Sequence, residues 1–222
     1  MASFDKILDA ARKRLGGEAA LAARLPAVKS PAELRAMPDD RYLSLMSQRI
    51  FRAGLKHSLV DAKWPAFEEV FHGFAPRRVR AMNDEAIEAL MSDTRLIRHW
   101  GKMRSVRANA AAMGEIAASS GSFGAWLADW PGTDIIGLWQ ALAKQFQQLG
   151  GNSGPYFLRM AGKDTFILTE PVVRALDHWR AFSGTPKTKA DRTRVQELFN
   201  GWATATGQPL AHLSMTLALS VD

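Results

Sequence analysis

Apolar residues recur at helical spacing along nearly all of this chain, and capping residues or glycines separate one periodic segment from the next. The single run with strand-like composition, residues 164–169, is too short to found a sheet. No internal repeat or low-complexity tract interrupts the pattern. We therefore expect an all-α fold, a bilobal helical bundle that forms one domain over residues 1–222.

Local signals set the expected helix bounds. Glycines 16–17 interrupt a first amphipathic segment over residues 3–24, and Ser30-Pro-Ala-Glu33 has the form of a capping box with proline at the first helical position. Asn83 and Thr94 are the expected N-caps of the two helices that follow them. The other expected helices cover residues 39–53, 64–70, 123–130, 134–149, 156–161, 171–182, 189–205 and 210–219.

Charge and composition narrow the classes of partner. The formal net charge is +7 at pH 7, which favours long-range attraction to nucleic acid or to an acidic surface. The chain contains no cysteine, so disulfides and thiolate metal sites are excluded. The N-terminus lacks the apolar core of a signal peptide, and no apolar run is long enough to span a bilayer. We expect a cytoplasmic protein that does not contact a membrane.

The segment over residues 96–110 combines an apolar stripe with a basic face. Arg95, Arg98 and Lys102 repeat at helical spacing and would present charge to solvent or to a polyanion. A solvated face of an ordinary helix explains the same pattern. The residues expected to form the buried stripe are Leu96, Trp100, Met103, Val106 and Ala110.

A glycine-rich segment, Leu149-Gly-Gly-Asn-Ser-Gly-Pro-Tyr156, lies between two expected helices. Glycines let backbone N–H groups approach a phosphate closely, and the N-terminus of the second helix adds a favourable dipole. Such a hairpin, expected at about residues 134–163, grips a DNA backbone without reading its sequence. The alternative is a helix that ends at glycine, followed by a tight turn.

Several ordered motifs resemble those of the DNA-3-methyladenine glycosylase I family, within the helix-hairpin-helix DNA glycosylases. They are Phe51-Arg-Ala-Gly-Leu55, the segment from Phe67 to Pro76, and Leu96-Ile-Arg-His-Trp-Gly-Lys-Met103 with Asn109-Ala110. The resemblance implies a divergent, bilobal base-excision repair enzyme. Such an enzyme extrudes an alkylated purine similar to 3-methyladenine from double-stranded DNA and hydrolyses its N-glycosidic bond.

The resemblance also implies roles for individual residues. Arg49, Phe51, His57 and Trp64 correspond to the region in which the family builds its base pocket. The hairpin would hold the DNA backbone through the following residues: Gly150, Gly151, Ser153, Gly154, Arg159 and Lys163.

The chain departs from the family at three places. Arg49 stands where the family carries a glutamate that recognises the base, and residues 1–38 contain no counterpart of the family's N-terminal pocket segment. The family's structural zinc cannot form on a chain without cysteine, and the five histidines are scattered. We therefore expect no metal and no cofactor.

Related glycosylases place an aspartate just after the second hairpin helix, where this chain has Thr169 followed by Glu170. Glu170 is the candidate catalytic carboxylate, which would stabilise an oxocarbenium-like sugar or orient a water. Thr169 as an N-cap and Glu170 in the first turn equally suit a plain helix start. Asp164 is a further candidate, although it also suits the end of the preceding helix.

Three functional classes remain open on the sequence. The first is an active glycosylase with an altered pocket, and the second is a DNA-binding relative that has lost the chemistry but keeps the scaffold. The third is a helical protein that uses the fold for protein interactions, with partners that the sequence does not identify. Salt-dependent binding to duplex DNA separates the first two classes from the third.

Overall fold

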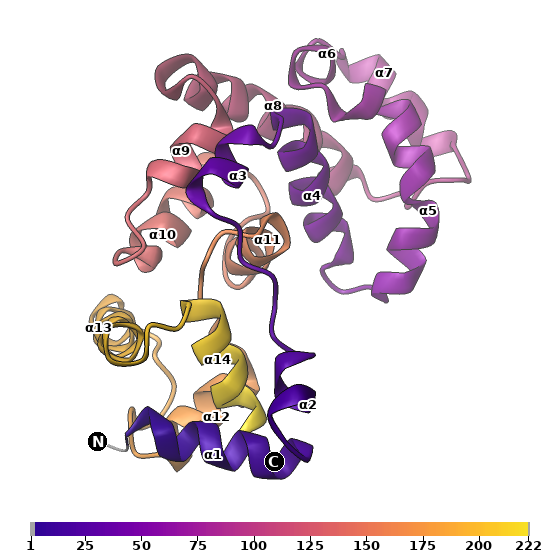
Figure 1. Ribbon diagram of the computed structural model, residues 1–222. Helices are drawn as coiled ribbons and strands as arrows, with labels where there is room; N and C mark the ends of the chain where they lie inside the picture. The colour runs from indigo at the N-terminus through magenta and orange to yellow at the C-terminus, as the bar shows by residue number, and fades with distance from the viewer. Residues whose placement is uncertain (1–2, 222) are drawn as a thin grey trace. The chain divides into compact units, whose positions relative to one another are not determined.

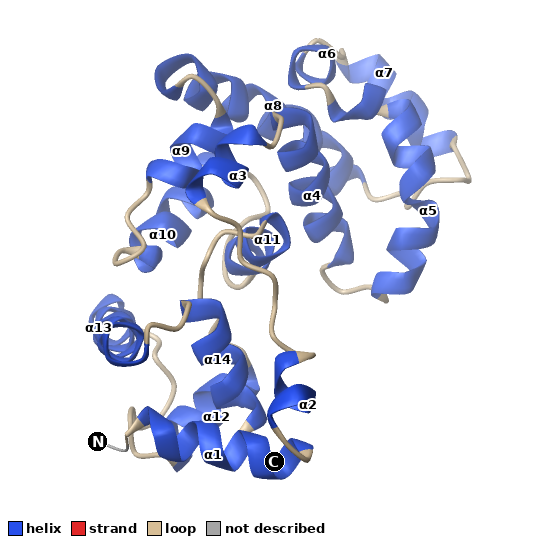
Figure 2. Ribbon diagram, viewed as in Figure 1, coloured by secondary structure: helices blue, strands red, loops and turns tan. Residues whose placement is uncertain are grey.

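The computed structural model describes residues 3–221, which are helical with no strand in that range, as Figure 2 shows. The chain divides into two compact units. Unit 1 comprises Met1–Lys29, Pro131–Leu138 and Gly162–Asp222, and unit 2 comprises Ser30–Trp130 and Trp139–Ala161. Each unit is therefore built from segments that are distant in the sequence.

Unit 1 joins the two ends of the chain, because α1 and α12 both pack against α14 (Figure 1). Its aromatic core runs from Phe4 through Trp202 to Phe199 and Phe166, and the last two rings are stacked 4.4 Å apart. The helices of unit 1 are α1 (Phe4–Leu15), α2 (Glu18–Ala22), α12 (Glu170–His178), α13 (Lys189–Thr206) and α14 (Leu210–Leu219).

Unit 2 contains the central part of the chain. Its helices are α3 (Pro31–Ala36), α4 (Asp39–Arg52), α5 (His57–Val70), η1 (His72–Phe74), α6 (Pro76–Arg80), α7 (Asp84–Ala89), η2 (Leu90–Ser92), α8 (Trp100–Ser120), α9 (Phe123–Asp129) and α11 (Ser153–Ala161). Helix α10 (Ile135–Gln145) begins in unit 1 and continues into unit 2.

A chain of aromatic rings forms one part of the unit 2 core. Trp64 stacks on Phe67 at 5.0 Å and on Phe74 at 5.3 Å, and Phe51 meets Phe67 edge-on at 4.6 Å. The Trp64 indole N–H donates to Ser44 Oγ at 3.0 Å. Because a buried indole N–H needs an acceptor, this bond lets the tryptophan lie in the core.

Several predicted helix ends are confirmed. Ser30 and Glu33 form the reciprocal capping box of α3, and Asn83 caps α7 through its side-chain oxygen. Helix α14 has the predicted bounds, and glycines 16–17 separate α1 from α2. Short-range capping chemistry therefore determines these ends.

The prediction that Thr94 caps the basic helix is wrong. Helix α8 begins at Trp100, and His99 is its N-cap, with the ring Nδ1 accepting from the amide of Lys102. Lys63 Nζ instead donates to the carbonyl oxygens of Thr94 and Arg95, both at 3.0 Å. These carbonyls are thus engaged by a side chain from α5 and do not start a helix.

The shift of the helix start changes the expected basic face. Arg95 and Arg98 precede α8, so helical spacing does not relate them to Lys102. Arg95 is paired with Asp93 and Glu69, whereas Lys102 is buried. Trp100, which was expected in the apolar stripe, is 39% exposed.

The expected start of α5 at Trp64–Pro65 is also wrong. The helix begins at His57 and contains Pro65 in its interior. A proline there removes one helical hydrogen bond and usually weakens a helix. Tertiary burial of Trp64 and Phe67 on this helix compensates for the lost bond.

Candidate functional site

The end of α4 in unit 2 is held by a buried lysine. Lys102 is 8% exposed, and its Nζ donates to the carbonyl oxygens of Ala53 at 2.7 Å and Phe51 at 3.4 Å. The last carbonyls of a helix have no partner within the helix, and a cation there also interacts favourably with the helix dipole. The chain then turns at Gly54, which has a φ of +78° that favours glycine.

Arg49 lies one turn before the end of α4, in contact with α11. Its guanidinium carbon lies 4.6 Å from the centroid of the Tyr156 ring, a cation–π arrangement. Its Nε is buried and has no hydrogen-bond acceptor in the described part of the chain. Burial therefore lowers the pKa of Arg49, and the nearby Arg52 lowers it further.

The two cations Arg49 and Lys102, which we call the cation pair, influence each other. Burial lowers the pKa of Lys102, and repulsion by Arg49 adds to the shift. No ion pair joins either residue to a carboxylate within residues 3–221. By contrast, the neighbouring Arg52 is neutralised by Asp61, with the guanidinium 2.6 Å from the carboxylate.

The other residues expected in the base pocket lie in different surroundings. Phe51 is fully buried and Trp64 is 9% exposed, both within the aromatic core. Other aromatic rings pack against both side chains, and Lys102 Nζ lies 6.0 Å from the centroid of the Phe51 ring. His57 is exposed at the first position of α5, and the neighbouring Leu55 is an exposed large apolar residue, 38% accessible.

The glycine-rich hairpin connects α10 and α11, and its first part is clamped by a buried asparagine. Asn109 of α8 donates from Nδ2 to the Gln147 carbonyl at 3.1 Å and accepts from the Gln147 amide at 2.8 Å. Gln148 then takes a positive φ of 65°. The Asn109 clamp therefore fixes where the hairpin turn begins.

The turn itself contains two exposed glycines. Gly150 and Gly151 are exposed, Gly151 has a φ of +57°, and the Ser153 amide donates to the Gly150 carbonyl at 3.2 Å. A Cβ at Gly154 would lie 3.1 Å from the Leu149 carbonyl oxygen, so glycine permits close packing there. This geometry suits contact with a phosphate, with Arg159 on the same helix α11.

The remaining predicted residues belong to unit 1. Lys163 is 8% exposed, so its side chain is largely covered. Asp164 accepts from the amides of Leu210 at 3.0 Å and Ala211 at 2.8 Å, which makes it a cap of α14. Glu170 is exposed in the first turn of α12, where Thr169 is the N-cap. The local geometry is thus the plain helix start described above.

Sequence reasoning assigned neither Lys102 nor Tyr156 to the site. Lys102 was expected on a face presented to solvent or to a polyanion, and only the tertiary contact with the end of α4 turns it inward. Tyr156 immediately follows the glycine-rich loop, but its stacking partner is far away in the sequence. No local periodicity signals either contact.

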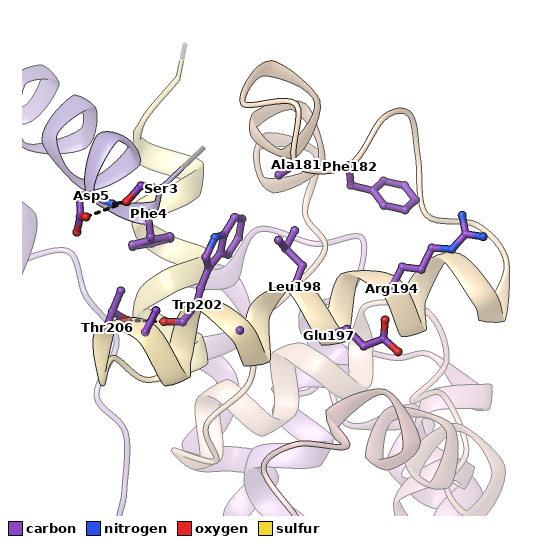
Figure 3. A pocket seen from close by; sticks show the side chains of 12 residues that line it. Ser3, Phe4, Asp5, Ala181, Phe182, Arg194, Glu197, Leu198, Trp202 and Thr206 are labelled. Atoms are coloured by element: carbon purple, nitrogen blue, oxygen red, sulfur yellow. Dashed lines mark hydrogen bonds between the residues drawn. The ribbon is translucent and has the colours of Figure 1, made fainter. Parts of the chain in front are cut away.

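Unit 1 also contains an apolar cavity of about 710 Å³, shown in Figure 3. None of the predicted site residues lines it. Phe4, Phe182 and Trp202 form its walls, and Arg194 and Glu197 lie at one end. In the described part of the chain, no three His, Asp or Glu side chains gather as metal ligands, and no helix is both long and apolar enough to cross a membrane.

Comparison with known proteins identifies relatives of this chain. The family model for methyladenine glycosylase matches residues 35–148, which include α4, the whole of α8 and the Asn109 clamp. DNA-3-methyladenine glycosylase 1 of Escherichia coli (strain K12) is 39% identical over 61 residues, or 28% of this chain. That match spans 33% of the relative, so the chain covers only a third of its length.

Two groups of solved structures share the fold. The 3-methyladenine DNA glycosylase I of Staphylococcus aureus has a TM-score of 0.51 at 23% identity, covering 56% of this chain and 77% of its own. The 8-oxoguanine glycosylase/lyase of Methanocaldococcus jannaschii, solved with DNA, has a TM-score of 0.50 at 11% identity and covers 96% of this chain and 86% of its own. At these identities the likeness is one of fold.

Proposed function

Because the chain belongs to the methyladenine glycosylase family, we propose that it is a DNA base-excision glycosylase that hydrolyses the N-glycosidic bond of an alkylated purine in duplex DNA. The observation that carries this proposal is the family match over residues 35–148, which contains the end of α4 and the Asn109 clamp of the hairpin. The matched region thus contains Arg49 and the residue that clamps the hairpin, whereas the glycine-rich turn and α11 follow it directly.

The hairpin supports the DNA-binding part of the proposal. The exposed amides at Gly150 and Gly151 would donate to a phosphate, and Arg159 on α11 would add charge. These contacts carry no sequence information, as expected of an enzyme that finds damage in any sequence. The net charge of +7 adds long-range attraction to DNA.

The region around the end of α4 supports the base-binding part. A base removed from the stack needs an aromatic or cationic surface and hydrogen-bonding groups, which Arg49 over Tyr156 supplies. The exposed Leu55 follows the turn at Gly54, and an apolar side chain in that place would fill the gap that an extruded base leaves in the duplex.

Hydrolysis transfers the sugar from the base to water. The oxygen of water forms a bond to C1′, the bond from C1′ to the purine nitrogen breaks, and its electron pair leaves with the base. A carboxylate would accept the proton of the attacking water or stabilise the cationic sugar. Glu170 is the candidate for that role, and Asp164 is not, because both its oxygens accept amides of α14.

The test is release of free base from duplex DNA under single-turnover conditions. The substrate panel contains dimethyl sulfate-methylated DNA and oligonucleotides with a single O6-methylguanine or hypoxanthine. We expect base release from at least one substrate, and Glu170→Gln to slow it by about 10²-fold or more. The matched control is Glu85→Gln, because Glu85 also occupies a first-turn position, in α7. Equal rates for both variants would exclude Glu170 from catalysis.

A DNA-binding relative without catalysis is the second candidate. The observation that favours it is Arg49 at the place where the resemblance expects a glutamate. In that case duplex binding would weaken steeply with salt, but no substrate in the panel would lose its base. If neither base release nor salt-dependent binding appears, both candidates fail.

A further inference from the structure

The cation pair consists of one buried and one partly buried cation that lack a paired carboxylate within residues 3–221. Lys102 is 8% exposed and bonded to two carbonyls, and the Nε of Arg49 is buried without an acceptor. Within residues 3–221, neither residue forms an ion pair, while the other two arginines of α4, Arg41 and Arg52, both do. Arg49 is thus the arginine of α4 that lacks a carboxylate partner among the described residues.

The guanidinium of Arg49 lies against the ring of Tyr156. Its central carbon is 4.6 Å from the ring centroid, a cation–π contact between α4 and α11. Its Nε is buried, and within residues 3–221 no hydrogen bond of the Arg49 guanidinium to another residue is found. The two terminal nitrogens of the guanidinium are therefore the donors that a ligand could reach. A planar guanidinium fork of this kind pairs with two acceptors of a purine edge, such as O6 and N7.

The same charges oppose a cationic ligand. At an effective dielectric constant of about 20, one unit charge about 8 Å away changes a binding equilibrium by on the order of 30-fold. The charges of Arg49 and Lys102 both weaken the binding of a cationic base beside Arg49. An N-alkylated purine nucleotide of the 3-methyladenine kind carries a positive charge, and this region would repel it.

Resting on the proposed glycosylase function, we propose that this site selects a neutral purine with an oxygen acceptor at its edge, such as an O6-alkylguanine, over a cationic N-alkylated purine. The terminal guanidinium nitrogens of Arg49 donate to the acceptor atoms of the purine. Lys102 adds positive potential while it holds the end of α4.

This selection has a chemical consequence. A neutral base is a poorer leaving group than a cationic one, because the electron pair of the broken bond leaves it negatively charged. Donors at the purine edge stabilise that charge as the bond from C1′ breaks. Arg49 therefore affects both the binding and the departure of the base. If it only repelled cationic bases, it would not speed the departure of neutral ones.

The experiment compares base release from three substrates by wild type, Arg49→Gln, Arg49→Glu and the control Arg95→Gln. Arg95 is exposed and ion-paired with Asp93, so its loss removes the same charge outside the cation pair. The substrates are duplexes with one O6-methylguanine or one hypoxanthine, and dimethyl sulfate-methylated DNA. The rate on each substrate is divided by its rate without enzyme, because cationic bases leave faster by themselves. We expect this rate enhancement by wild type to be about 10-fold or more larger for the neutral bases than for the methylated purines.

The variants test the role of Arg49. Arg49→Gln should slow release of the neutral bases about 10-fold without slowing release of the cationic ones, and Arg49→Glu should reverse the preference. A wild-type rate enhancement over the uncatalysed reaction that is as large for cationic bases as for neutral bases would overturn the inference. So would an equal loss on every substrate, which would mark Arg49 as a phosphate contact.

Failure of the proposed function is recognised separately. If wild type releases no base from any duplex, the glycosylase activity fails, and binding of free nucleosides decides the inference. Tryptophan fluorescence then compares neutral inosine with cationic 7-methylguanosine for wild type and Arg49→Glu. Tighter binding of inosine by wild type, reversed in Arg49→Glu, supports the inference, and any other order overturns it.

Discussion

Replacing Asn109 by alanine tests whether the clamp on Gln147 positions the hairpin. The side chain is fully buried and makes two hydrogen bonds to one backbone unit, at 3.1 Å and 2.8 Å. Each net bond is worth about 1 kcal/mol, and a cavity adds to the loss. We therefore expect Asn109→Ala to lower the free energy of unfolding by about 2–3 kcal/mol. We also expect duplex affinity to fall about 10-fold, because the exposed amides of the hairpin lose their fixed position.

The assays are urea unfolding and fluorescence-anisotropy titration of a labelled duplex at fixed salt. The matched control is Asn83→Ala, which removes the N-cap of α7 and should cost about 1 kcal/mol without changing duplex affinity. A loss of stability below about 0.5 kcal/mol in Asn109→Ala would refute the reasoning about the clamp. Equal loss of duplex affinity in both variants would refute its link to DNA binding.

Three further predictions concern other parts of the structure. Asp164→Ala removes the acceptor of two α14 amides and should lower the free energy of unfolding by about 1–2 kcal/mol in urea unfolding, and an unchanged midpoint would contradict the capping role. Gly151→Ala places a side chain at a φ of +57° and should cost about 1 kcal/mol, whereas Gly150→Ala, in open space, should cost less. Burial and Arg49 lower the pKa of Lys102, so the unfolded chain binds more protons there between that lowered pKa and about 10.4. The stability of wild type relative to Lys102→Met should therefore rise with pH through this window, and a pH-independent difference in urea unfolding would contradict the shift.

Much of the secondary structure could be predicted because its signals are local. The capping box at Ser30 and Glu33, the N-cap Asn83 and the bounds of α14 depend on residues within one or two helical turns. The prediction was wrong where a distant side chain competes with local bonding. Lys63 takes the carbonyls of Thr94 and Arg95, and the helix therefore begins later than its periodicity indicates.

The candidate site also combines features that local sequence signals predict with features that depend on distant contacts. The glycine-rich hairpin and the position of Arg49 on a helix were evident from residue types and spacing. The packing of Phe51 and Trp64 into the aromatic core, and the capping of α14 by Asp164, depend on contacts between segments far apart in the chain. A catalytic carboxylate and a carboxylate that caps a helix occur in the same local sequence pattern. The sequence therefore left both roles open for Asp164 and Glu170.

The amino-acid sequence by itself determined the helical class, most helix ends and the family resemblance, since these follow from residue spacing and short-range hydrogen bonds. Only the tertiary structure decided that Lys102 turns inward to the carbonyls of α4, that Arg49 stacks on Tyr156, and that Asn109 clamps the hairpin. The physical reason is burial. Removing a charge or an amide from water requires partners, and in this fold those partners come from distant segments.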